Sequence, residues 1–187
     1  MKGILLFHNS WEEGVFNYMK NYFLYLALST KMENESNFKD ILYFKNKRIV
    51  AVDRNTYNKN DRLNLQQSYK FMPFSVNQRV FKSLLSYAAE SPGEIIIKNI
   101  EFFDETIEDS SEYDDIQNDL SKMDYNNILE KVLYILEEFD TEIYSILLSY
   151  KGYDFYLSGE GVMDTNAPDD ILFNFTGDEK VSNTLLL

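Results

Sequence analysis

The sequence predicts an α+β fold in which a mainly antiparallel sheet packs with about three to four helices. Three observations support this fold class. Apolar residues recur at helical spacing in three segments, apolar residues alternate with polar ones in several short segments, and two pairs of these short segments flank tight turns. No Pro-, Gly- or Ser-rich linker interrupts the chain, so residues 1–187 are expected to form a single domain.

Three helices are predicted: one over 11–29, one between the Ser75/Gln78 capping box and Ser91, and one from about Asp124. The first follows a second capping box, made by Ser10 and Glu13. The third places six apolar side chains on one face: Ile128, Leu129, Val132, Leu133, Leu136 and Phe139. These stripes indicate helices that bury one side against a core.

Strands are expected between the helices, over 41–44, 48–52, 94–97, 100–103, 143–150, 153–157 and 171–175. The first two flank a short turn at 45–47, and the pair 143–150 and 153–157 flanks Lys151-Gly152, so both pairs are predicted to be hairpins. Residues 53–70 and 158–170 are expected to be loops, and 185–187 a frayed tail.

The composition is sufficient for a hydrophobic core and excludes several classes of enzyme. Of the 187 residues, 44% are hydrophobic and 16% aromatic, which excludes a wholly disordered chain. There is no cysteine and one histidine, so thiolate or multi-histidine metal sites are excluded and no metal or cofactor is expected. His8 is interpreted as structural, no serine has the surroundings of a nucleophile, and an enzyme is not expected.

Charge is unevenly distributed along the chain. The net charge is −13, yet 14 of the 18 Lys and Arg residues lie in 1–100, whereas 22 of the 31 acidic residues lie in 101–187. Such a field argues against nucleic acid or an anionic membrane as a direct partner. The basic stretch 45–62 is interpreted as a source of internal salt bridges or as a self-association surface.

A cytoplasmic location is expected. The short apolar run at 1–7 is followed by polar residues before a signal-peptide core is complete, and the apolar stretch 15–28 contains too many polar residues to span a bilayer.

The acidic segment, residues 101–119, contains nine acidic residues and no basic one. It is either a solvated acidic loop or a docking surface for a basic partner. Interleaved aromatic residues (Phe102, Phe103, Tyr113 and Tyr125) favour docking, because an interface needs apolar anchors among its charges. The predicted partner-binding residues are Glu101, Asp104, Glu105, Glu108, Asp109, Glu112, Tyr113, Asp114, Asp115 and Asp119.

A small, acidic, cysteine-free chain with such a segment resembles the immunity proteins of bacterial contact-dependent growth inhibition and polymorphic toxin systems. The resemblance rests on the acidic segment and its aromatic residues, without a shared motif. It implies a cytoplasmic protein that binds a cognate toxin and blocks its active site or its substrate surface. Such toxins are often basic nucleases that act on tRNA.

Two other functions remain open from the sequence. One is a nucleic-acid mimic that inhibits a defence protein. The other is an acidic regulatory or structural protein that docks on a larger assembly. Genetic context discriminates between them, since an adjacent gene for a large secreted toxin favours an immunity protein. The oligomeric state and the stoichiometry do not follow from the sequence.

Overall fold

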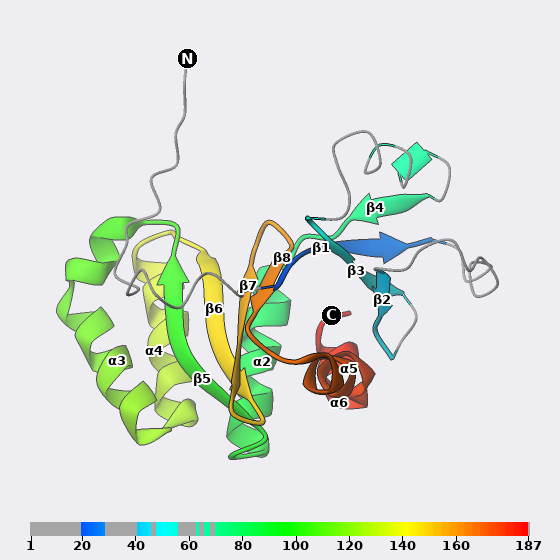
Figure 1. Ribbon diagram of the computed structural model, residues 1–187. Coiled ribbons are helices and arrows are strands. Elements are labelled where there is room, and N and C mark those ends of the chain that lie inside the picture. Colours follow the sequence, from blue (N-terminus) through cyan, green and yellow to red (C-terminus); the bar gives the residue numbers. More distant parts are fainter. Residues whose placement is uncertain are drawn as a thin grey trace.

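A computed structural model describes residues 20–28, 41–45, 48–55, 63, 66–67 and 70–186. Within these residues the chain forms one eight-stranded sheet with helices packed against it (Figure 1). The strands are β1 (Lys20–Ala27), β2 (Ile41–Tyr43), β3 (Ile49–Asp53), β4 (Phe71–Pro73), β5 (Ile95–Phe102), β6 (Ile143–Tyr150), β7 (Tyr153–Ser158) and β8 (Val162–Thr165). The predicted α+β class is therefore confirmed.

The strand order is β2-β3-β1-β8-β7-β6-β5, and every pair of neighbouring strands is antiparallel. Strand β4 also pairs with β1, on the side that β1 shares with β8. Both predicted hairpins are present, as β2–β3 and β6–β7. The second turns at Lys151 and Gly152, which both have positive φ angles, as a two-residue hairpin turn requires.

Five α-helices are present in the described residues: α2 (Gln78–Glu90), α3 (Ser111–Lys122), α4 (Tyr125–Glu138), α5 (Asp169–Gly177) and α6 (Glu179–Thr184). A short 3-10 helix, η3 (Glu105–Asp109), precedes α3. Side-chain oxygens cap four of these five α-helices, at residue types that favour the position: Asn77 for α2, Ser110 for α3, Asp124 for α4 and Asp178 for α6.

Residues from all five α-helices share one apolar core with one face of the sheet. Part of this core is aromatic, and in it the ring of Phe175 in α5 stacks on that of Phe155 in β7 with centroids 4.1 Å apart. A smaller cluster, made by Tyr25, Val50, Val52 and Phe71, lies on the other face. Strand β1 therefore buries apolar side chains on both of its faces.

The prediction of a helix over 11–29 is wrong for its described part, because residues 20–27 form β1. Residues 11–19 lie outside the described residues. Side chains of β1 alternate between the two clusters, with Leu24 in the large core and Tyr25 in the small one. A strand that is buried on both faces has a continuous apolar run, and such a run also fits the helical period.

Three predictions near the C-terminal end are also wrong. Residues 171–175, predicted as a strand, belong to α5, and the predicted loop 158–170 contains β8. Leu185, predicted to lie in a frayed tail, is fully buried in the core. In each case long-range packing decides the structure, which short local patterns do not encode.

Smaller differences concern the boundaries and faces of elements. The side chain that caps α2 is Asn77 rather than Ser75, and the two strands predicted over 94–103 form one strand, β5, with irregular pairing after Ile97. Leu133 in α4 and Phe139, which directly follows the helix, are exposed although the predicted apolar stripe includes both. Ile135, outside that stripe, is buried instead.

Candidate functional site

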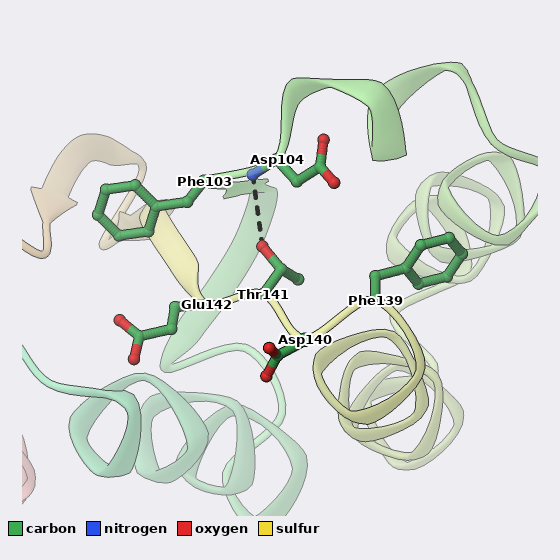
Figure 2. A pocket seen from close by; sticks show the side chains of 6 residues that line it. All are labelled: Phe103, Asp104, Phe139, Asp140, Thr141 and Glu142. Atoms are coloured by element: carbon green, nitrogen blue, oxygen red, sulfur yellow. Dashed lines mark hydrogen bonds between the residues drawn. The ribbon is translucent and has the colours of Figure 1, made fainter.

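A depression of about 420 Å³ lies where β5 ends and β6 begins (Figure 2). Six residues line it: Phe103, Asp104, Phe139, Asp140, Thr141 and Glu142. Two of them follow β5, and the other four connect α4 to β6. The depression therefore combines the first part of the acidic segment with a second segment about 35 residues later in the sequence.

Backbone hydrogen bonds hold these two segments together. The amide of Phe103 donates to the carbonyl of Glu142 at 2.9 Å. The amide of Asp104 donates to the Thr141 hydroxyl at 3.3 Å, the bond drawn in Figure 2. Asp140, with φ of +47°, turns the chain out of α4 and into the connection to β6. Asp adopts this left-handed conformation more readily than most residues. The walls of the depression are thus fixed by the fold.

Two phenylalanines at the depression are exposed, Phe103 by 56% and Phe139 by 38%. The ring of Phe103 meets that of Tyr144 edge to face, with centroids 5.1 Å apart. Exposed aromatic side chains in a hollow are typical anchors of protein interfaces, because covering them removes a large apolar area from water. This part of the surface thus has the apolar component that an interface needs.

The charges at the depression are all negative. Asp104, Asp140 and Glu142 line it, and none of its described lining residues is basic. Hydrogen bonds from the hydroxyl and the backbone amide of Thr106 lower the pKa of Asp104 below its usual value, so this carboxylate stays ionised in mildly acidic solution. The depression can therefore attract cations but not phosphate groups.

A second depression, of about 590 Å³, adjoins the first. It is lined by Ser75, Val76, Asn77, Gln78, Arg79, Phe103, Glu142, Ile143, Gly159 and Glu160. Because Phe103 and Glu142 line both hollows, we treat the two depressions together as one groove, which runs from the end of α4 to the start of α2.

The ten predicted partner-binding residues divide into groups. Asp104 lines the groove, and Glu105, Glu108 and Asp109 are exposed on η3, directly after it. The residues Glu112, Asp114 and Asp115 lie on α3, the first half-buried and the other two exposed. The acidic segment is therefore folded along its whole length, as the end of β5, then η3, then α3.

The remaining three predicted residues make internal contacts. Glu101 accepts a hydrogen bond from the Ser145 hydroxyl, and Asp119, only 8% exposed, lies 2.6 Å from Nζ of Lys131. The Tyr113 hydroxyl donates to Asn99 at 3.1 Å. Burial, followed by the charge of Glu108, raises the pKa of Tyr113 to about 12. These contacts give the three side chains a role in the fold.

Sequence reasoning missed Phe139, Asp140, Thr141 and Glu142. A signal was present, because residues 137–142 repeat the mixture of acidic and aromatic residues seen in the acidic segment. Phe139 was assigned to the buried stripe of its helix, and the pairing of β5 with β6, which brings the two segments together, is not readable locally.

The other candidate features provide little further chemistry. His8 lies outside the described residues, as does much of the basic stretch 45–62. Within that stretch, the Arg54 guanidinium lies over the Phe23 ring, 4.6 Å from its centroid. In the ranges that the structure describes, no group of three or more His, Asp or Glu side chains is placed to hold a metal ion. None of the described helices has the length and apolar character needed to cross a membrane.

Comparison with protein-family models, with curated proteins and with solved structures finds no match for this chain. The geometry and the charge of the site are therefore the observations that bear on function.

Proposed function

We propose that this protein is a cytoplasmic immunity protein that binds and neutralises a cognate basic bacterial toxin. The observation that carries the proposal is the acidic end, which we define as the groove and η3: here carboxylates lie on the same part of the surface as two exposed phenylalanines, Phe103 and Phe139. This surface has the charged and the apolar components of a protein interface.

The charge favours a nuclease as the toxin. A nuclease presents Lys and Arg side chains to the phosphates of its substrate, which for this toxin class is often tRNA. Carboxylates that meet these side chains occupy the substrate surface and exclude the nucleic acid. Residues 101–142 contain fifteen acidic residues and two lysines, so this part of the chain attracts such a surface from a distance.

Electrostatic attraction also makes association fast. Charge complementarity raises association rate constants to about 10⁸–10⁹ M⁻¹s⁻¹ at low salt. A fast rate matters for an inhibitor of an enzyme toxin, because each free toxin molecule turns over many substrate molecules. The apolar anchors act later, since burying them slows dissociation.

The proposal is tested by co-expression and by a binding titration with the product of the adjacent gene. The wild-type protein should restore growth of cells that express this gene product, and its association rate should fall steeply with added salt. Glu105→Lys/Glu142→Lys reverses two charges at the acidic end and should slow association by at least about tenfold. Asp104 is left unchanged because its carboxylate caps η3.

Glu90→Lys/Glu179→Lys is the matched control, because it changes net charge by the same amount at two exposed positions, on α2 and α6, outside residues 101–142. Its association rate should be much closer to that of the wild type. Equal effects of the two double variants would mean that net charge alone matters. Growth that is not restored, together with no binding at any salt concentration, would contradict the proposed function.

A further inference from the structure

Hydrogen bonds also connect the walls of the second hollow. The amide of Gly159 donates to the carbonyl of Tyr144 at 2.8 Å, and the amide of Val76 donates to the carbonyl of Gly159 at 3.1 Å. The Gln78 side chain makes two hydrogen bonds to the backbone of Ile143, at 3.0 and 3.1 Å. A site that is already formed has little ordering to lose on binding.

The chemistry of the groove changes along its length. Phe103, which both hollows share, gives the middle an exposed apolar surface, whereas Val76 and Ile143 beneath the second hollow are buried in the core. Asp104 and Asp140 line one end. The other rim carries Glu160 and one cation, the Arg79 guanidinium.

We infer that the groove binds an extended segment of the partner that carries basic residues on both sides of one apolar residue. This inference rests on the proposed function and adds which part of the toxin is recognised: a loop or tail rather than a flat face. The two hollows, of about 420 and 590 Å³, are open to solvent along their length, so they can receive side chains from a segment laid across them. A flat face would leave them empty, whereas an extended segment can place side chains into both.

The charges of the groove predict where the bound segment has basic residues, and the apolar surface of the groove predicts where it has an apolar residue. The carboxylates of Asp104 and Asp140 at one end complement Lys or Arg side chains, and so does Glu142, which lines both hollows. At the other end Glu160 can do the same, although Arg79 lies on the same rim. The exposed ring of Phe103 in the middle favours an apolar side chain, which covers the ring and is itself covered.

The probe is a capped peptide with two arginines on each side of a phenylalanine, added to ¹⁵N-labelled protein and followed by NMR. The matched peptide has serine in place of phenylalanine. We expect amide shifts at Phe103, Thr141 and Gly159, and affinity about tenfold weaker for the serine peptide, because it lacks the buried ring. Equal affinities, or shifts confined to α3, would overturn the inference.

Phe103→Ser should weaken binding of the phenylalanine peptide by about tenfold, to the level of the serine peptide. Phe173→Ser is the control, because Phe173 on α5 is comparably exposed and lies outside the groove. Both side chains are at the surface, so both variants should fold. An unchanged affinity of Phe103→Ser would overturn the inference.

The two proposals fail in different ways. If the toxin binds and depends on the acidic end, but Phe103→Ser leaves its affinity unchanged, the proposed function stands and the groove inference is wrong. If the peptide binds in the groove but the adjacent gene product does not bind, the proposed function is wrong and the groove remains a site for basic segments.

Discussion

Gly161 is the residue that fixes the junction of β1, β4 and β8. Its carbonyl accepts a hydrogen bond from the amide of Leu24 at 2.7 Å, and its φ is +76°. A Cβ atom at this position would collide with the backbone oxygen of Phe74. Both the conformation and the space therefore require glycine here. The same turn, residues 158–161, supplies one wall of the groove.

Gly161→Ala should lower the free energy of unfolding by about 3 kcal/mol or more, because the alanine is strained and Phe74 must also move. Gly152→Ala is the control: its φ is +85°, but nothing lies near its Cβ position. The control should cost only the strain of the left-handed conformation, about 1–2 kcal/mol. Urea denaturation measures both. Similar decreases in the free energy of unfolding for the two variants would mean that the backbone of Phe74 can move aside at little cost.

At the scale of the element, the sequence predicts the helices α2 and α4 equally well, but it predicts the buried face of α2 better than that of α4. Val80, Leu84 and Leu85 of α2 are buried as the periodicity indicates. In α4 the period is right, but the buried stripe is centred on Ile128, Val132 and Ile135, so Leu133 lies outside it. Apolar periodicity predicts that a helix forms, but the elements packed against the helix decide which of its faces is buried.

Leu84→Ala should lower the free energy of unfolding by about 2–5 kcal/mol, because Leu84 is 0% exposed and the substitution leaves a cavity. Leu133→Ala removes the same atoms from a side chain that is 36% exposed, and should cost less than about 1 kcal/mol. Denaturation with urea, monitored by circular dichroism, compares them. Equal costs would contradict the assignment of the α4 face.

Local chemistry explains which elements the sequence could predict. The hairpins β2–β3 and β6–β7 are predictable because each depends on a short turn. The helices α2 and α4 are predictable because their capping residues and apolar periodicity are also local features of the sequence. Strand β1 and helix α5 were misassigned because short apolar runs fit either structure. Their state is decided by distant partners, β3 and β8 for β1 and the aromatic core for Phe175 of α5.

For the candidate site, too, the sequence predicts only the part that depends on local chemistry. The acidic residues and Phe103 were readable from composition, since charge and aromatic content need no tertiary information. The contact of Asp119 with Lys131, and the contribution of residues 139–142 to the groove, depend on how α3 packs on α4 and on how β5 pairs with β6. No local pattern contains that information.

At the scale of the whole molecule, the dominant feature is self-repulsion. The net charge is −13, and most of the excess lies in residues 101–142. The described ion pairs that relieve it within this stretch involve a single lysine, Lys131, with Asp115 at 3.8 Å and Asp119 at 2.6 Å. Folding therefore brings like charges together at some cost in free energy.

Raising the salt concentration from about 0.01 M to about 0.15 M should increase the free energy of unfolding, because the screening length falls from about 30 Å to about 8 Å. The expected gain is a few tenths to about 1 kcal/mol. Urea denaturation at the two concentrations measures it. Glu105→Lys/Glu142→Lys, with less repulsion to screen, should gain less. Stability that falls with added salt would contradict the prediction.

Strand β1 joins the two ends of the described chain, since Lys20–Ala27 pairs with Val162–Thr165 of β8. A nascent chain that emerges from the ribosome cannot close this sheet until β8 has been made, so the fold depends on contacts of very high sequence separation. Under the proposed function, protection is then delayed until translation has passed β8. If the proposed function holds, a cell needs a stock of finished inhibitor before the toxin arrives.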